Sequence, residues 1–231
     1  MREPAIEFNG EATDLYIRHF SFWPHLSEYE KQQLCDHTGP VSYCRGKNIY
    51  RGQMDCIGVL LIKSGQLRVY TLSDDGREVT LYRLFPGEVG ILSASCALKA
   101  VTFEVFMDAE EDTEVLVTDS SVFEQLTRQN IYVKCFGYEL AAARLSEMLW
   151  TLQQILFMSA DQRFARFLLQ ESRQCGSDEI HLTHEQIARY MGSAREVVSR
   201  LVKYFTQEGI LDAKRGCLKI IHRERLQLLA K

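Results

Sequence analysis

The sequence predicts an α+β fold with three parts: a β-roll, one long helix and a C-terminal winged helix-turn-helix. Between about residues 41 and 117, short runs of Val, Ile, Leu, Tyr and Thr alternate with glycines, as in short strands joined by turns. An apolar heptad pattern follows. Two short amphipathic helices and a β-hairpin are then expected near the C-terminus. The predicted domains are the roll over residues 1–125, the long helix over 126–158 and the winged helix over 159–231.

The composition is that of a globular protein with a local excess of positive charge. Hydrophobic residues make up 46% of the 231 residues and charged residues 25%. We expect no contact with a membrane and a cytoplasmic location, because no stretch approaches the roughly 20 apolar residues of a spanning helix and the N-terminus does not resemble a signal peptide. The formal net charge is −4, yet residues 161–231 hold 13 Lys and Arg against 9 Asp and Glu. Such asymmetry is compatible with nucleic-acid binding by the C-terminal third.

The N-terminal part predicts short helices followed by hairpins. The first 35 or so residues suggest one or two short helices, with Pro24 starting the second. The clearest hairpin is QLRVYTLSDDGREVTLYRL, in which two alternating strands meet at Asp75 and Gly76. A glycine at that position can adopt the positive φ that tight turns require.

The helix expected after Asp119 has two apolar faces. A second stripe, Phe136, Leu140, Met148 and Ile155, lies beside the heptad stripe. We expect one face to pack on the roll and the other on a second copy of the helix, while a central helix buried within a monomer is the alternative. The unbroken heptad favours the dimer seam, which comprises Ile131, Cys135, Tyr138, Ala142, Leu145, Leu149, Leu152 and Leu156.

Local signals near the C-terminus predict a helix-turn-helix. Thr183 and Gln186 form a capping box at the start of a helix that stops at Gly192, and Ser193 with Glu196 suggests a second capping box. The following helix is expected to end near Gly209, and the run Lys214-Arg215-Gly216 predicts the basic tip of a wing. Two short helices joined by a tight glycine turn are typical of DNA-binding modules.

The second of these helices carries a polar face suited to base recognition. Arginine can donate two hydrogen bonds to guanine, and glutamate can accept one from the amino group of cytosine. The alternative is an ordinary solvated face with Glu196 serving only as a cap; the turn and the basic wing favour DNA. The predicted DNA-binding residues are Thr183, His184, Ser193, Arg195, Glu196, Ser199, Arg200, Lys203, Lys214 and Arg215.

The segment LTHEQIARYMGSAREVVSRLVKYFTQEGIL resembles the DNA-binding motif of the cyclic-AMP receptor and FNR superfamily of bacterial transcription regulators (Crp/Fnr family). SDDGREVTLYRLFPGEVG is similar to the family's β-roll hairpin, so the resemblance covers the whole chain. It implies a cyclic-nucleotide-binding-like roll that senses an effector, and a homodimer on a palindromic operator with half-sites about 34 Å apart. The partners it implies are double-stranded DNA, a second copy of the chain, an unidentified small effector and RNA polymerase.

The resemblance also suggests which bases are read. Arg195, Glu196 and Arg200 resemble the base-reading residues of the cyclic-AMP branch, whereas Glu196, Ser199 and Arg200 resemble the Glu–Ser–Arg trio of the FNR branch. Both branches read a GA step. We therefore expect an inverted repeat with a TGA core.

The effector is not expected to be cyclic AMP or cyclic GMP. Cyclic-nucleotide members bind the ligand phosphate with an Arg-Ser or Arg-Thr pair, and the corresponding place here holds Phe103 and Glu104. An aromatic ring cannot neutralise a phosphate, and a carboxylate repels it. The predicted effector pocket comprises Glu88, Gly90, Ile91, Ser93, Ser95, Cys96, Phe103 and Glu104.

The sensing chemistry is left open by the cysteines and histidines. The seven cysteines form no CxxC pair, so we expect reduced thiols and no local metal ligand set. The spacing of Cys35 and Cys44 does not match the cysteine cluster of an iron–sulfur sensor. A haem sensor could use His19, His25, His37, Cys56 or Cys96, and Cys96 could be either a redox-sensing thiol or simply a buried one. The cofactor is thus unknown, and none is required for the fold.

Two other functional classes remain as alternatives. An enzyme on a metal-dependent roll would need histidine ligands, but no histidine occurs between His37 and His181. No G-x-S-x-G, HExxH or P-loop motif is present either, so we expect no enzyme and no catalytic residue. The other alternative is a regulatory module that binds a protein partner without an operator.

Overall fold

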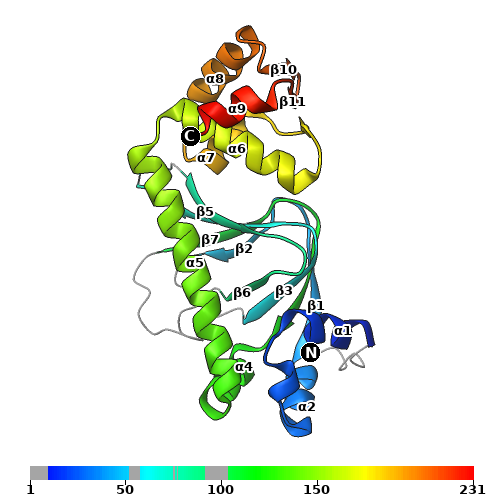
Figure 1. Ribbon diagram of the computed structural model, residues 1–231. Coiled ribbons are helices and arrows are strands. Elements are labelled where there is room, and N and C mark those ends of the chain that lie inside the picture. Colours follow the sequence, from blue (N-terminus) through cyan, green and yellow to red (C-terminus); the bar gives the residue numbers. More distant parts are fainter. Residues whose placement is uncertain (1–9, 52–57, 75, 77, 92–103) are drawn as a thin grey trace. The chain divides into compact units, whose positions relative to one another are not determined.

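The computed structural model describes residues 10–51, 58–74, 76, 78–91 and 104–231 (Figure 1). The chain groups into two compact units, and each is considered by itself. The first unit comprises Met1–Thr71 and Tyr82–Glu147, and the second comprises Leu72–Leu81 and Met148–Lys231. The domain limits expected from the sequence stay predictions.

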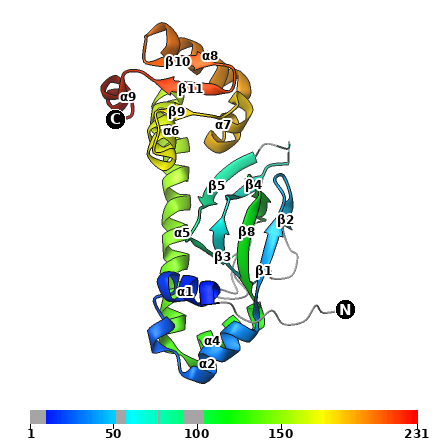
Figure 2. The same ribbon diagram turned by 90° about the vertical axis from the view of Figure 1, so that its right-hand side faces the viewer.

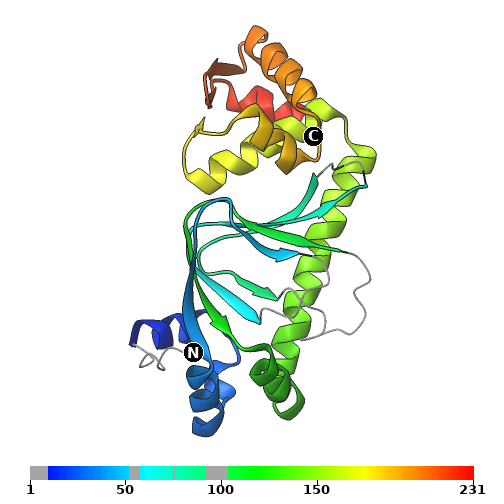
Figure 3. The same ribbon diagram turned by 180° about the vertical axis from the view of Figure 1, so that it is seen from behind.

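The β-roll consists of two four-stranded sheets whose strands are short, as predicted (Figure 3). The strands of the first sheet, in spatial order, are β1 (Thr38–Tyr43), β8 (Thr113–Thr118), β3 (Val59–Ser64) and β6 (Val89–Ile91). Those of the second are β2 (Asn48–Arg51), β7 (Phe106–Ala109), β4 (Leu67–Leu72) and β5 (Glu78–Leu84). The neighbours β4 and β5 confirm the expected hairpin, and Gly76 has a φ of 81° in the turn.

The two sheets enclose an apolar core. Leu60 and Ile62 of β3, Val69 of β4 and Met107 of β7 are completely buried there. Each such side chain contributes about 1.5–3 kcal/mol relative to an exposed position. This core holds the two sheets of the roll together.

Helical segments gather at one end of the roll (Figure 3), and two of them, α2 and α4, contact each other. They are α1 (Gly10–His19), the 3-10 helix η1 (Trp23–His25), α2 (Glu28–Asp36) and α4 (Ser120–Gln129). The prediction that Pro24 starts the second helix is wrong, because Pro24 lies inside the 3-10 turn, which begins at Trp23. The second α-helix starts after Ser27, whose hydroxyl forms a capping box with Glu30.

Helix α5 (Ile131–Phe157) has the two faces that the sequence predicts. Phe136 and Leu140 are half-buried and pack against the aromatic cluster of the first unit, with the Phe136 ring 5.1 Å from that of Phe22. All eight residues of the heptad stripe are exposed, including Leu149 at 55% and Leu156 at 61% of their surface. A long apolar face of α5 is therefore uncovered in the single chain.

The second unit holds a compact helical domain with a small sheet (Figure 2). Its sheet has the order β10-β11-β9, and both strand pairs are antiparallel. The elements are α6 (Ala160–Cys175), β9 (Glu179–Ile180), α7 (His184–Met191), α8 (Arg195–Gln207), β10 (Leu211–Lys214), β11 (Cys217–Ile220) and α9 (Arg223–Leu229). Phe164, Ile187, Val198 and Phe205 are fully buried and join α6, α7 and α8 in one core.

None of the helices among the described residues is both long and apolar enough to span a bilayer.

Candidate nucleic-acid interface and effector pocket

Helix α7 begins and ends where the sequence predicts. The Thr183 hydroxyl accepts a hydrogen bond from the amide of Gln186 at 3.2 Å, and the Gln186 side chain accepts one from the amide of Thr183 at 2.9 Å. Gly192 ends the helix in the left-handed conformation, with a φ of 58°. A left-handed residue at this position lets the chain turn sharply into the next helix.

The second predicted capping box is wrong. Helix α8 begins at Arg195, and its N-cap residue is Ala194, which offers no side-chain acceptor. The amide of Ser193 donates to the carbonyl of Ala188 at 2.9 Å, so Ser193 belongs to the turn that closes α7. The helix therefore starts one residue later than expected, with Ala194 in place of Ser193 as its N-cap, and Glu196 is not required as a cap.

The outward face of α8 carries the predicted polar residues. Arg195, Glu196, Arg200 and Lys203 are exposed. Ser199 is half-buried, and its hydroxyl lies 3.0 Å from Nδ1 of His184, which links α8 to the start of α7. The charged side chains thus stand on one face of a helix whose opposite face is fixed in the core.

The wing hairpin closes one side of a groove next to this helix. Strands β10 and β11 pair with Lys214 opposite Cys217, leaving Arg215 and Gly216 at the tip. A groove of about 440 Å³ lies here, and Thr183, His184, Arg195, Lys214 and Arg215 are among its lining residues. The fold thus brings together five of the ten predicted DNA-binding residues from three separate segments. Arginine and lysine at such a groove are suited to phosphate oxygens.

A half-buried arginine that the sequence analysis missed supports α7. Arg163 of α6 donates a hydrogen bond of 2.6 Å to the carbonyl of Met191 in the last turn of α7. Burial lowers the pKa of Arg163. A cation at a helix C-terminus satisfies a carbonyl that has no partner within the helix.

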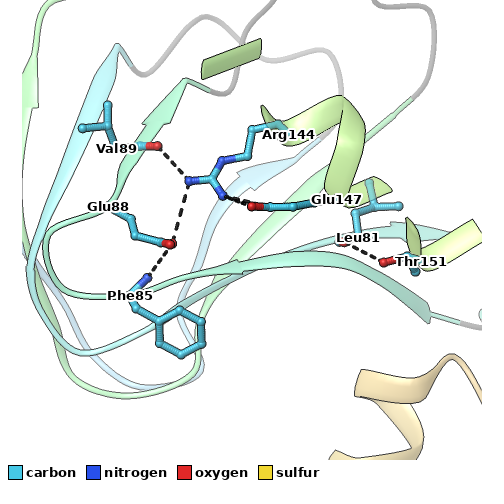
Figure 4. A network of polar contacts seen from close by, with 7 residues as sticks. All are labelled: Leu81, Phe85, Glu88, Val89, Arg144, Glu147 and Thr151. Atoms are coloured by element: carbon cyan, nitrogen blue, oxygen red, sulfur yellow. Dashed lines mark hydrogen bonds and ion pairs between the residues drawn. The ribbon is translucent and has the colours of Figure 1, made fainter. Parts of the chain in front are cut away.

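The predicted effector pocket lies only partly within the described residues. Ser93, Ser95, Cys96 and Phe103 fall outside them. Glu88 accepts a hydrogen bond from the amide of Phe85 at 3.2 Å (Figure 4). Gly90 and Ile91 belong to strand β6, and Glu104 is exposed. Among the described pocket residues, none is a cation.

Arg144 of α5 lies beside Glu88 and was also missed (Figure 4). Its guanidinium donates to both carboxylate oxygens of Glu147 at 2.9 and 2.8 Å and to the carbonyl of Val89 at 3.2 Å, and it lies 3.7 Å from Glu88. It also stands 5.1 Å from the ring of Tyr82, where burial raises the tyrosine pKa to about 12. Residue 144 continues the four-residue spacing of Phe136 and Leu140, which pack on the roll. A charged residue within this apolar stripe was the feature of the sequence that could have revealed the contact.

The candidate haem and iron–sulfur ligands are dispersed. His25 stacks on Tyr132 with ring centres 3.8 Å apart, and Nδ1 of His37 lies 2.9 Å from the carbonyl of Gln33. Burial raises the pKa of the Cys35 thiol, and Cys44 is exposed. Within the part of the chain that the structure describes, neither these residues nor His19 belongs to a cluster of three possible metal ligands. Cys56 and Cys96 lie outside it.

Comparison with known proteins gives matches along most of the chain. Residues 40–130 match the family of cyclic nucleotide-binding domains, and residues 162–229 match the family of Crp-like helix-turn-helix domains. A crystal structure from Eubacterium rectale, assigned to the crp/fnr family of transcriptional regulators, is 40% identical, with a TM-score of 0.86 and coverage of 92% of this chain and 98% of that one.

Two curated relatives represent both branches of the resemblance. The cyclic AMP receptor protein of Thermus thermophilus is 29% identical over 189 residues, which cover 81% of this chain and 86% of the relative. The transcriptional activator protein FnrA of Stutzerimonas stutzeri is 26% identical over 188 residues, covering 77% and 74%.

Proposed function

The chain belongs to the Crp/Fnr family of DNA-binding transcription regulators, and from this premise we propose that it binds a palindromic operator as a homodimer. Each α8 enters the major groove of one half-site, and each half-site contains a TGA core. The wing and the start of α7 contact the phosphates on either side.

The observation that carries this proposal is the arrangement around α8. Arg195, Glu196 and Arg200 are exposed on the first turns of a helix whose other face is anchored in the core. Arginine donors match the O6 and N7 acceptors of guanine, and the glutamate matches the amino group of cytosine. Lys214 and Arg215 border the adjacent groove, where they offer positive charge to the phosphates.

The uncovered face of α5 supports the homodimer. Eight exposed residues at heptad spacing form a continuous stripe, and six of them are large or branched apolar side chains. A second copy related by two-fold symmetry supplies an identical stripe, so each residue meets its counterpart or a neighbour of its counterpart. We expect the two α8 helices of such a dimer to bind half-sites about one DNA turn, or 34 Å, apart.

We further propose that the roll controls DNA binding through a small effector that is not a cyclic nucleotide. Glu104, at the place of the phosphate-binding pair of cyclic-nucleotide members, is an acid, and a carboxylate repels the ligand's phosphate. Arg144, the cation beside Glu88, already binds Glu147 with two hydrogen bonds. Isothermal calorimetry with cyclic AMP checks whether a cyclic nucleotide binds. A dissociation constant in the low micromolar range contradicts the proposal that the effector is not a cyclic nucleotide. RNA polymerase is the expected partner of the DNA-bound dimer.

The sensing mode is distinguished by an absorption spectrum of the anaerobically purified protein. A Soret band indicates haem, and a broad visible band bleached by oxygen indicates an iron–sulfur cluster. A colourless protein leaves a thiol or an organic effector as the sensed species.

The operator is tested by selection of bound sequences from a random DNA pool. Wild type is expected to enrich an inverted TGA repeat, and Arg200→Ala to bind that repeat more weakly by about 1–3 kcal/mol with relaxed preference at one base. Arg173→Ala is the matched control, because Arg173 is exposed on α6 and does not line the groove. Failure of the wild type to enrich any sequence, with or without cell extract as a source of effector, contradicts the proposal and favours a protein-partner module.

A further inference from the structure

Three side chains that can bind a metal converge on the outer face of the wing sheet. They are Glu179 of β9, His181 directly after β9, and Cys217, the first residue of β11. One ligand atom from each lies within 4.8 Å of the other two. Glu179 and His181 are exposed and Cys217 is half-buried, so the site is open to solvent.

The strand register explains why these residues meet. Strands β9 and β11 are antiparallel, with Leu218 opposite Ile180 and Lys219 opposite Glu179. Side chains alternate between the two faces of a sheet, and Ile180 and Leu218 point into the core. Their neighbours in sequence therefore point outwards. Continuing the register by one residue places Cys217 opposite His181, at the distance of cross-strand partners.

We propose that Glu179, His181 and Cys217 bind a zinc ion at the base of the wing, a property that goes beyond DNA recognition. A carboxylate, an imidazole and a thiolate are all ligands that zinc accepts, and three protein ligands leave its fourth position for water. With zinc–ligand bonds of about 2.0–2.3 Å, ligand atoms in a tetrahedral site lie roughly 3.5 Å apart. Glu179 and His181 are exposed, so their side chains have room to rotate and shorten the present separation of up to 4.8 Å.

The charges around the site change when zinc binds. Glu179 accepts a hydrogen bond from Lys219 at 2.8 Å. Zinc displaces the ammonium from this carboxylate, and the Cys217 thiol releases its proton to solvent as the zinc–sulfur bond forms. The group formed by Glu179, His181, Cys217 and Lys219 is neutral before binding and carries one positive charge afterwards.

This change occurs beside the residues proposed to contact phosphate. Cys217 pairs with Lys214 across the wing hairpin, next to the tip residue Arg215. The metal ties β9, which precedes the helix-turn-helix, to β11, which follows the tip. Zinc binding therefore stiffens the wing and adds positive charge next to the groove. The phosphate backbone of DNA is then attracted more strongly than by the zinc-free protein.

The test uses Co²⁺ as a coloured substitute for zinc and the reduced full-length chain. A thiolate ligand gives a charge-transfer band in the near ultraviolet, and tetrahedral coordination gives intense visible bands. Wild type is expected to bind one Co²⁺ per chain with both signatures, and one equivalent of zinc to abolish them. Cys217→Ser is expected to lose the thiolate band, and His181→Asn to weaken Co²⁺ binding at least tenfold.

Matched controls are available in the same unit. Cys175→Ser and His222→Asn remove an exposed cysteine and an exposed histidine that lie outside the cluster, and both variants are expected to behave as the wild type. A wild-type protein without a thiolate band, or a Cys217→Ser variant that retains it, overturns the proposal. Unchanged circular dichroism excludes unfolding as the cause of a loss. Because the measurement contains no DNA, its outcome is independent of the proposed operator binding.

Discussion

Two helices of this chain present exposed faces of opposite chemistry. Helix α8 turns Arg195, Glu196 and Arg200 towards solvent, whereas α5 exposes Leu145 at 54% and Leu149 at 55% of their surfaces. A charged face is well hydrated and costs little to leave in water. An exposed apolar stripe costs about 25 cal/mol for each Å² that could be buried. The proposed function gives the two faces different partners: polar base edges and phosphates for α8, and the same helix of a second chain for α5.

The largest expected effect comes from placing a charge in the apolar stripe. Leu149 exposes 55% of its surface, so Leu149→Asp removes from each chain roughly half of the about 1.5–3 kcal/mol that full burial of a leucine contributes. It also adds two carboxylates to the proposed dimer that must be desolvated. We expect sedimentation equilibrium to show a dimer for wild type and a monomer for this variant. Ala143→Asp is the control, because Ala143 is exposed on the same helix outside the stripe. Equal masses for Leu149→Asp and wild type would show that the stripe is not the seam.

A smaller effect is expected from the cations at the wing tip. Removing Lys214 and Arg215 together should weaken binding to all DNA sequences about equally, because phosphate contacts carry no sequence information. The slope of log K against log salt should fall by roughly 0.9 for each lost contact. The control lacks Arg173 and Lys231, two exposed cations that do not line the groove. A loss confined to the selected operator, with an unchanged slope, contradicts the assignment.

The cap of α7 should have a modest effect on stability. Thr183→Ala removes the hydroxyl that accepts from the Gln186 amide, which should lower the free energy of unfolding by about 1 kcal/mol. Thr183→Ser keeps the acceptor and should restore most of this loss. Urea denaturation followed by circular dichroism measures both. Equal stability of the alanine and serine variants means that the capping box contributes nothing.

The smallest effect is expected at Ser193. Its side chain does not cap α8, since the N-cap residue is Ala194. Ser193→Ala should therefore change the free energy of unfolding by less than about 0.5 kcal/mol, as surface substitutions usually do. A loss as large as that of Thr183→Ala in the same urea experiment would indicate that Ser193 caps the helix in solution.

Local signals allowed much of the fold to be predicted. The capping box at Thr183, the glycine stop at Gly192 and the β4–β5 hairpin each depend on a few neighbouring residues. Where two local readings compete, the prediction fails. Ser193 can serve as a cap or as part of the preceding turn. The hydrogen bond from its amide to the carbonyl of Ala188 shows that it belongs to the turn. Pro24 is compatible with the first turn of an α-helix or with a 3-10 turn, and it lies in a 3-10 turn that begins at Trp23.

Sites assembled from distant strands could not be predicted in this way. Glu179 and Cys217 are far apart in the chain, and only the register of β9 against β11 brings them together. A search for closely spaced cysteines therefore finds no metal site here. Arg144 and Glu88 likewise meet only because α5 packs along the roll. The position of Arg144 within an apolar stripe was visible in the sequence, but its partners were not.

In the proposed function the two exposed faces act together, one joining two chains and the other reading DNA. The most direct test is sedimentation of the protein with a duplex carrying an inverted TGA repeat. In a second duplex, about 5 base pairs, or half a helical turn, are inserted between the half-sites. We predict two chains per duplex on the first and at least tenfold weaker binding to the second. One chain per duplex, or equal affinity for both, would contradict the account.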